Sequence, residues 1–149
     1  MTDYKKVFID TAPFIYFIEK NQDNPQYFDA IKDFFDKCYR NDVEVVTSVI
    51  TIEEYMVYPY RINSQQYIDV FYKLLSTMGT NIINVDQTIA KKAARIRAEY
   101  SSFKAMDALQ LAVAILSGCD VFLTNDRQLR QFAEMNVILV SELVDNGEY

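Results

Sequence analysis

Residues 6–13 of the chain read KVFIDTAP. The first part, residues 6–9, is a short apolar run of the kind that forms a buried strand in a parallel sheet. Asp10 follows this run directly, and Pro13 stands where a proline fits the first turn of a helix. Either Asp10 or Thr11 is a suitable cap for that helix. The segment therefore predicts a buried strand that passes into a helix, with an aspartate at the junction.

Similar apolar runs recur along the chain and alternate with segments of helical periodicity. This alternation predicts a three-layer α/β sandwich with a five-stranded, mainly parallel sheet and a single domain over residues 1–149. A helix at 48–58 is expected to stop before Pro59, and the residues after 140 are expected to form a short polar tail. The expected strands are 6–9, 43–47, 81–85, 121–124 and 137–140, and further helices are expected at 104–117 and 126–134.

The composition is that of an ordinary soluble globular protein. Of the 149 residues, 50% are hydrophobic and 24% are charged. The longest apolar stretch, residues 111–116, is too short to cross a bilayer, and the first residues contain no signal-peptide core. We therefore expect a cytoplasmic protein. The net charge of −6 argues against a protein whose task is to coat nucleic acid without specificity.

The residue types that are missing narrow the chemistry. The sequence has no histidine, which excludes Ser-His-Asp catalysis, Cys-His catalysis and histidine-bound zinc. Cys38 and Cys119 form no CxxC pair, and the three glycines at 79, 118 and 147 are too scattered for a phosphate-binding loop. Carboxylates, hydroxyls and basic side chains remain. Carboxylates without histidine favour hard divalent cations such as Mg²⁺ or Mn²⁺.

Several acidic residues stand at or near the ends of the expected strands. Asp10 follows the first strand, Asp126 follows the fourth, and Asp107 lies on the helix between the third and the fourth. Glu53 and Glu54 lie on the helix after the second strand and point about 100° apart, so only one of them can face a common site. If the first and fourth strands are neighbours, these acids meet at one sheet edge. Such a cluster repels itself unless a cation is bound.

A simpler explanation remains open for each of these acids. Asp10 and Asp126 stand where helix N-caps are expected. Asp107 lies among apolar residues, and its simplest partner is Lys104, three positions earlier on the same helix.

Two other classes of α/β protein also place acids at strand ends. A phosphate-accepting receiver domain, with Asp86 as the acceptor, needs an acidic pair after the first strand and a lysine after the fifth. A haloacid-dehalogenase-like phosphatase needs a second aspartate two positions after Asp10, where Ala12 stands. The sequence disfavours both classes.

Four segments of the chain, taken together, resemble the PIN domain and, within that family, the VapC-like toxin nucleases. They occur in the order that the family has and span nearly the whole chain. The resemblance places the metal-binding acids of the family on Asp10, Glu54, Asp107 and Asp126. Glu54 is the match because the family acid stands three residues after a threonine, as Glu54 stands after Thr51. The matching segments are residues 7–11 (VFIDT), 47–54 (TSVITIEE), 104–114 (KAMDALQLAVA) and 121–126 (VFLTND).

The resemblance also implies a fold and an activity. It implies a five-stranded parallel sheet with the first and fourth strands adjacent, and a metal-dependent endoribonuclease in which the four acids are both catalytic residues and ligands of Mg²⁺ or Mn²⁺. It further implies the toxin of a toxin–antitoxin pair, with RNA as substrate, a cognate antitoxin as partner, and a homodimer. The tyrosine-rich segment 55–60 next to Glu54 has three open roles, which are stacking on bases, a dimer contact and packing in the core. The alternative is a PIN fold that has lost its nuclease activity and binds RNA or protein.

Some neighbours of the four acids have two expected roles. Thr11, Thr124 and Asn125 either hydrogen-bond the ligands of the site or cap and turn the chain. Arg127 and Arg130 come just after the fourth strand and are candidates for contacts to RNA phosphates.

Overall fold

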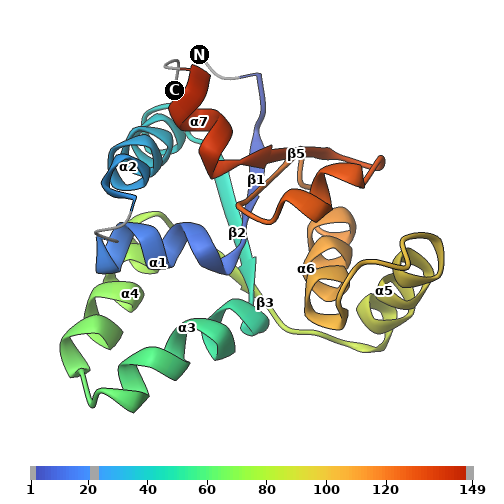
Figure 1. Ribbon diagram of the computed structural model, residues 1–149, viewed down its shortest axis with the longest axis horizontal. Coiled ribbons are helices and arrows are strands. Elements are labelled where there is room, and N and C mark those ends of the chain that lie inside the picture. Colours follow the sequence, from blue (N-terminus) through green and yellow to red (C-terminus); the bar gives the residue numbers. More distant parts are fainter. Residues whose placement is uncertain (1–2, 21–23, 147–149) are drawn as a thin grey trace.

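Five parallel strands form the centre of the computed structural model, which describes residues 3–20 and 24–146 (Figure 1). Their order in the sheet is β3-β2-β1-β4-β5, and each neighbouring pair is parallel. Phe8 of β1 pairs with Val46 of β2 on one side and with Phe122 of β4 on the other. The predicted parallel sheet, with the first and fourth strands adjacent, is therefore confirmed. The strands are β1 (Lys6–Ile9), β2 (Glu44–Ser48), β3 (Asn81–Ile83), β4 (Val121–Thr124) and β5 (Asn136–Leu139).

Helices cover both faces of this sheet, as the predicted three-layer sandwich requires. Figure 1 shows α5 and α6 on one side and α1, α2 and α4 on the other. The helices are α1 (Thr11–Glu19), α2 (Pro25–Arg40), α3 (Val49–Arg61), α4 (Gln65–Thr77), α5 (Gln87–Glu99), α6 (Ala105–Leu116) and α7 (Val140–Asn146), with a short 3-10 helix η1 (Arg127–Gln131) after β4. No helix in the described ranges combines the length and the apolar character that a membrane crossing needs.

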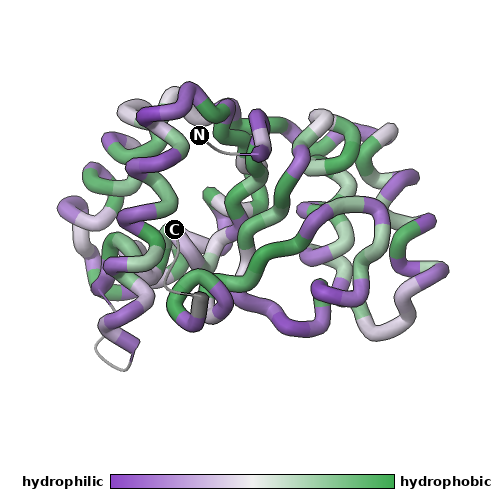
Figure 2. The backbone as a smooth tube through the Cα atoms, turned by 90° about the horizontal axis from the view of Figure 1, so that it is seen from above, coloured by the Kyte–Doolittle hydropathy of each residue, from purple (hydrophilic) through white to green (hydrophobic). Residues whose placement is uncertain are grey.

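The interior is built from strand residues that point alternately to the two faces of the sheet. Val7 and Ile9 of β1 are fully buried in the core shared with α1, α2, α3, α4 and α7. Phe8, between them, is fully buried in the second core under α5 and α6, where its ring stacks on Phe122. Figure 2 shows the hydrophobic strand segments running between the two groups of helices. A strand buried on both faces explains why residues 6–9 read as a continuous apolar run.

Helix α3 continues through Pro59 to Arg61, so the prediction that it stops before Pro59 is wrong. A proline inside a helix lacks the N–H that would bond the carbonyl four residues earlier. Pro59 is buried, and one turn before it the ring of Tyr55 stacks on Phe71 of α4 with the ring centroids 3.9 Å apart. Packing of α3 against α4 therefore outweighs the missing hydrogen bond.

The end of the chain also differs from the prediction. The residues after 140 form helix α7 instead of a polar tail, because Val140 and Leu143 are buried in the core that α2 covers. The helix expected over 126–134 is reduced to the short 3-10 helix η1. Both differences lie beyond the strand β4 and leave the carboxyl edge of β1 and β4 in place.

Candidate active site

Asp10 lies at the carboxyl end of the central strand and receives hydrogen bonds from three parts of the fold. Its backbone N–H donates to the carbonyl of Leu123 at 3.0 Å and so extends the pairing of β1 with β4. Its Oδ1 accepts from the N–H of Thr11 at 2.8 Å, which makes Asp10 the N-cap of α1. The same oxygen accepts from Nε2 of Gln110 at 3.3 Å, and Oδ2 accepts from the hydroxyl of Thr124 at 2.8 Å. The carboxylate is thus a helix cap and also the centre of a polar cluster.

Glu54 reaches the same cluster from α3. Its Oε1 accepts a hydrogen bond of 2.7 Å from the hydroxyl of Thr11, the residue next to Asp10. Glu53 is exposed and makes no such bond in the described part of the chain. Of the two adjacent glutamates, Glu54 is therefore the one that α3 directs toward the carboxyl edge of the sheet.

Asp107 lies in the first turn of α6 and interacts electrostatically with the other three acids. Burial, followed by the charges of Asp10, Asp126 and Glu54, raises the pKa of Asp107 to about 6, and the charge of Lys104 opposes the rise. The ion pair between Asp107 and Lys104 that the sequence left open is not among the four ion pairs of residues 3–20 and 24–146. Asp107 is therefore coupled to the acids of the sheet edge.

Asp126 follows β4 and is the N-cap of η1. Its Oδ1 accepts from the N–H of Gln128 at 3.0 Å, and its own N–H donates to the hydroxyl of Thr124 at 3.2 Å. Because Thr124 also donates to Asp10, one threonine bridges the residues that follow β1 and β4. The capping role expected for Asp126 is present, and it places this acid beside Asp10.

The electrostatics of this edge are those of a cluster of uncompensated negative charges. Burial raises the pKa of Asp10, hydrogen bonds from Thr124, Thr11 and Gln110 lower it in part, and the charge of Asp126 raises it further. Burial likewise raises the pKa of Glu54, the bond from Thr11 lowers it, and the charges of Asp10 and Glu53 raise it. None of the ion pairs in the described ranges brings a lysine or an arginine to these acids. Repulsion of this kind disappears when a cation binds.

The polar residues that are buried as whole residues, among those that the structure describes, belong to this edge. Gln110 of α6 is 1% exposed, and its amide bonds Asp10, Thr51 and Ser48. Gln110 is a residue of the site that was not expected from the sequence. A polar residue within the apolar stretch of α6 is a usable signal, because an unsatisfied buried amide is costly. The set consists of Thr11, Thr47, Ser48, Thr51, Gln110 and Thr124.

The remaining candidates from the sequence divide into two groups. Thr11 and Thr124 donate to the acids, as one of their two expected roles requires. Asn125 instead bonds the hydroxyl of Tyr16 and the backbone of Ser141, both at 3.3 Å. Asn125 therefore holds the loop after β4 and does not reach the acids.

The two arginines after β4 also differ from each other. Arg130 donates to the carbonyl of Val137 at 3.1 Å and forms an ion pair of 2.8 Å with Glu142, so it ties η1 to β5 and α7. Arg127 is exposed and has no hydrogen bond or ion pair with the described residues. Of the two, Arg127 is the cation available for a ligand.

The donor set suits a hard divalent cation, although the side chains are not assembled around one. Carboxylate oxygens are the ligands that Mg²⁺ and Mn²⁺ prefer. Within residues 3–20 and 24–146, however, no group of three or more Cys, Asp or Glu side chains is positioned to hold a metal ion. Asp10 and Glu54 are instead bonded to threonine hydroxyls. The chemistry of the residues fits a metal ion, and binding would require at least three of the acids to come closer together.

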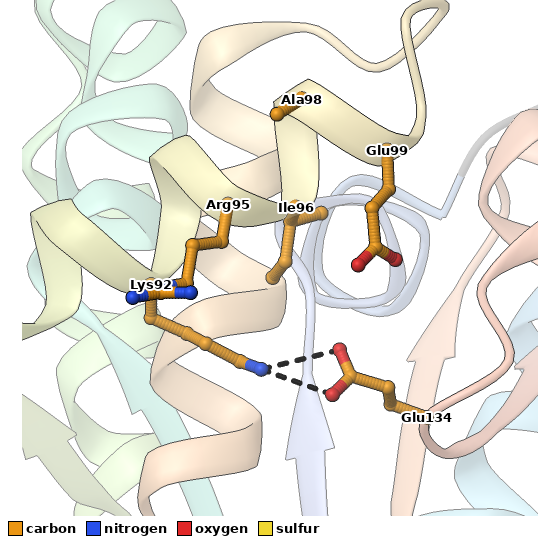
Figure 3. A pocket seen from close by; sticks show the side chains of 6 residues that line it. All are labelled: Lys92, Arg95, Ile96, Ala98, Glu99 and Glu134. Carbon is orange, nitrogen blue, oxygen red and sulfur yellow. Dashed lines mark hydrogen bonds and ion pairs between the residues drawn. The ribbon is translucent and has the colours of Figure 1, made fainter.

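A cavity of about 380 Å³ lies elsewhere, on α5 (Figure 3). Lys92 of its lining points toward Glu134 and donates to both carboxylate oxygens of Glu134, at 2.9 and 3.2 Å. None of the four acids of the sheet edge lines this cavity, so it is separate from the candidate site. Its lining residues are Lys92, Arg95, Ile96, Ala98, Glu99 and Glu134.

Comparisons with known proteins agree with this geometry. A family model described as the PIN domain matches residues 7–135. The comparison with curated proteins gives no match.

Several solved structures share the fold. A toxin–antitoxin complex from Klebsiella pneumoniae is 24% identical, with a TM-score of 0.67, over 90% of this chain and 97% of that chain. VapBC2 from Rickettsia felis, bound to a DNA fragment from its promoter, is 15% identical, with a TM-score of 0.64, over 90% and 98%. FitAcB from Neisseria gonorrhoeae is 19% identical, with a TM-score of 0.65, over 91% and 98%. At these identities the likeness is one of fold.

Proposed function

The chain belongs to the PIN domain family, and from this premise we propose that it is a metal-dependent endoribonuclease that hydrolyses RNA phosphodiester bonds. The catalytic and metal-binding residues in this proposal are Asp10, Glu54, Asp107 and Asp126. The observation that carries it is the state of Asp10. This carboxylate lies at the end of the central strand and is held by neutral donors. Its charge interacts with those of the three further acids, and none of the four acids forms an ion pair with the described residues. That arrangement destabilises the protein unless it binds something positive.

The acids would hold Mg²⁺ or Mn²⁺, which both suit carboxylate ligands. When bound, such an ion lowers the pKa of a coordinated water and polarises a phosphoryl oxygen. The chain itself supplies the oxygens and their orientation. Thr124 fixes Oδ2 of Asp10, and Thr11 fixes Oε1 of Glu54. Because the pKa values of Asp10, Glu54 and Asp107 are raised, protons compete with the ion for these carboxylates.

The solved structures that share this fold support a more specific biological role. One of them, from Klebsiella pneumoniae, is a toxin–antitoxin complex. We propose that this chain is the toxin of such a pair, that a cognate antitoxin binds it, and that it forms a homodimer and acts in the cytoplasm on RNA. The exposed large hydrophobic side chains of α3, α4 and the loop between them support a protein interface in this part of the molecule. They are Val57, Tyr58, Tyr60, Ile62, Val70 and Tyr72.

The positions of the acids also support a second candidate, a PIN fold that binds RNA or protein without cutting. No three acids in the described ranges form a ready metal-binding group. The two candidates differ in one measurable property, which is cleavage that depends on a divalent ion.

Adjacent glutamates on α3 provide a matched test. A purified preparation is incubated with single-stranded RNA and Mn²⁺, and the cleavage rates of parent, Glu54→Gln and Glu53→Gln are compared. The proposal predicts cleavage by the parent, a loss of at least about a hundredfold in Glu54→Gln, and a rate near that of the parent in Glu53→Gln. A parent that binds RNA and does not cut it would favour the binding module.

A further inference from the structure

Gln110 is a buried amide whose partners come from three other elements. It is 1% exposed and lies on α6 between residues that are fully buried and apolar, including Ala108 and Leu111. A primary amide in such surroundings is costly unless its donors and acceptor are hydrogen-bonded. Its Nε2 is 2.8 Å from Oγ1 of Thr51 and 3.3 Å from Oδ1 of Asp10. Its Oε1 accepts from the hydroxyl of Ser48. Both ends of the amide are therefore used.

The hydroxyls of Thr51 and Thr47 determine which end of the Gln110 amide faces Asp10. Oγ1 of Thr47 lies 2.8 Å from the carbonyl of Ile9 and 2.8 Å from Oγ1 of Thr51. A carbonyl only accepts and a hydroxyl has one proton, so the proton of Thr47 goes to Ile9. The proton between the two threonines is then that of Thr51. Thr51 has only lone pairs left for Gln110, and the amide must present its N–H groups on this side.

Ser48 gives the same result from the other end of the amide. Its Oγ accepts from the N–H of Ile50 at 3.1 Å, which leaves its proton free to bond Oε1 of Gln110. A reversed amide would place Oε1 beside the carboxylate of Asp10, where two acceptors repel each other. Each donor in the network is therefore determined. The amide of Gln110 donates to Thr51, Thr51 donates to Thr47, and Thr47 donates to the backbone carbonyl of Ile9.

The bonds to Asp10 are unequal at its two oxygens. Oδ1 accepts two of them, from the N–H of Thr11 and from Gln110, whereas Oδ2 accepts one, from Thr124. Each carboxylate oxygen has about two lone-pair positions. Oδ1 is therefore saturated and Oδ2 keeps one free position. A cation that approaches Asp10 finds its ligand at Oδ2.

We propose that Gln110 is a positioning residue of the site. The hydrogen bonds that link Ile9, Thr47 and Thr51 fix the orientation of its amide. In that orientation Nε2 of Gln110 saturates Oδ1 of Asp10 and leaves Oδ2 as the oxygen that binds a divalent cation. This inference rests on the proposed function. It assigns to Gln110 and Thr47 an effect on metal affinity although neither has an atom that would bind the ion. A merely structural role would lower thermal stability and leave metal affinity unchanged.

The experiment measures the dissociation constant for Mn²⁺ by titration calorimetry of the parent and three variants. Gln110→Met keeps the length of the side chain and removes its donors. Thr47→Val keeps the shape of the side chain and removes the hydroxyl to which Thr51 donates, which frees Thr51 to turn its proton toward the amide. Thr80→Val is the matched control, because Oγ1 of Thr80 is buried and has no hydrogen-bond partner among the described residues.

We expect Gln110→Met to weaken Mn²⁺ binding by about 10- to 100-fold, the range for side chains that orient metal ligands. Thr47→Val should weaken it by a smaller factor, and Thr80→Val should leave it unchanged. RNA cleavage at saturating Mn²⁺ should recover most of the parent rate in Gln110→Met, because the variant lowers affinity for the ion and keeps all four acids.

The outcomes separate this inference from the function on which it rests. If the parent binds Mn²⁺ and cuts RNA while Gln110→Met and Thr47→Val match its Mn²⁺ affinity, the positioning role is wrong and the nuclease stands. If the parent neither binds Mn²⁺ nor cuts RNA, the proposed function fails and this inference fails with it. Should Gln110→Met not fold, Thr47→Val decides the question alone, and an unchanged Mn²⁺ affinity in that variant overturns the inference.

Discussion

Asp10 and Asp120 lie at opposite ends of the same pair of central strands and are held in opposite ways. Asp120 precedes β4 at the amino edge, where its exposed carboxylate accepts from the backbone N–H groups of Lys5 and Lys6 at 2.8 and 3.0 Å. The nearby side chain of Lys6 pairs with Glu44. Asp10 follows β1 at the carboxyl edge, where its carboxylate accepts from one side-chain hydroxyl, one side-chain amide and one backbone N–H, and where the charge of Asp126 raises its pKa.

The difference between Asp120 and Asp10 distinguishes a carboxylate with a structural role from one that is suited to bind a ligand. Asp120 accepts from two backbone donors and is exposed to solvent, so water and these donors satisfy its charge. Burial and the charge of Asp126 make the ionised form of Asp10 unfavourable, and its hydrogen-bond donors are neutral groups that do not cancel its charge. Aspartate-to-asparagine changes at Asp10, Asp107 and Asp120 separate the two kinds of site. A matched pair of arginine changes does the same for the cations after β4.

Catalysis should show the largest effect. Asp10→Asn should reduce Mn²⁺-dependent RNA cleavage by at least about a hundredfold, because even residues that only orient metal ligands are worth about 10- to 100-fold. Asp120→Asn should cut at nearly the parent rate. The measurement is a cleavage assay on purified, folded proteins. If Asp10→Asn cuts as fast as the parent, the nuclease assignment is wrong at this residue.

Thermal stability with and without the metal ion should show the next largest effect. At a hundredfold excess over its dissociation constant, Mn²⁺ should stabilise the parent by about 2.7 kcal/mol, which raises Tm by roughly 5–10 °C for a chain of this size. Asp120→Asn should respond as the parent does, and Asp10→Asn should respond much less. Differential scanning calorimetry measures the shifts. Equal shifts in all three proteins would place the ion elsewhere.

The pH dependence of stability in the absence of metal should reveal a smaller effect at Asp107. Its folded pKa of about 6 exceeds the unfolded value, so the folded state binds more protons and stability falls as pH rises through 6. Asp107→Asn should remove this loss and stabilise the metal-free protein at pH 8 by about 1 kcal/mol, after allowance for solvent screening of a half-exposed carboxylate.

Urea unfolding at several pH values tests this effect. The gain in Asp107→Asn should shrink toward zero as pH falls below about 4. Asp120→Asn should instead lose stability at pH 8, by about 1 kcal/mol, because it weakens two hydrogen bonds to backbone donors. A destabilised Asp107→Asn at pH 8 would show that Asp107 is a structural acid like Asp120.

RNA affinity should show the smallest effect and should separate the two arginines after β4. Arg127→Ala should weaken RNA binding and reduce the salt dependence by about one phosphate contact. Arg130→Ala should leave the salt dependence unchanged and lower stability, since Arg130 is bonded to Val137 and Glu142. Binding titrations at several salt concentrations measure both. If Arg130→Ala reduces the salt slope and Arg127→Ala does not, the roles are reversed.

Local pattern was sufficient for the sheet and for the two acids that follow β1 and β4. A strand buried on both faces reads as an apolar run, and the residue that follows it lies at the carboxyl edge, so the sequence located Asp10 and Asp126. Local pattern failed where a distant contact decides the structure. Helix α3 tolerates Pro59 because it packs against α4, and the residues after 140 are helical because Leu143 reaches the core beside α2.

The role of Gln110 shows the same limit within the site. Its partners Ser48, Thr51 and Asp10 lie 62, 59 and 100 positions away in sequence. No residue near Gln110 in the chain indicates these partners. The nearest acid of the site in sequence is Asp107, three positions before Gln110. The resemblance to the PIN domain located the four acids, and the orientation of Asp10 became visible only from the folded hydrogen bonds.

The placement of β1 between β2 and β4 also affects how the protein is made. Thr124 and Asp10 are separated by 114 positions in sequence, and β1 lies between β2, which follows it in the chain, and β4, which is synthesised much later. A nascent chain that ends before residue 121 contains Asp10 and Glu54 but neither Thr124 nor Asp126. The site is therefore incomplete until residue 126 has been synthesised. A ribosome that stalls earlier on this message holds a polypeptide with an incomplete set of acids.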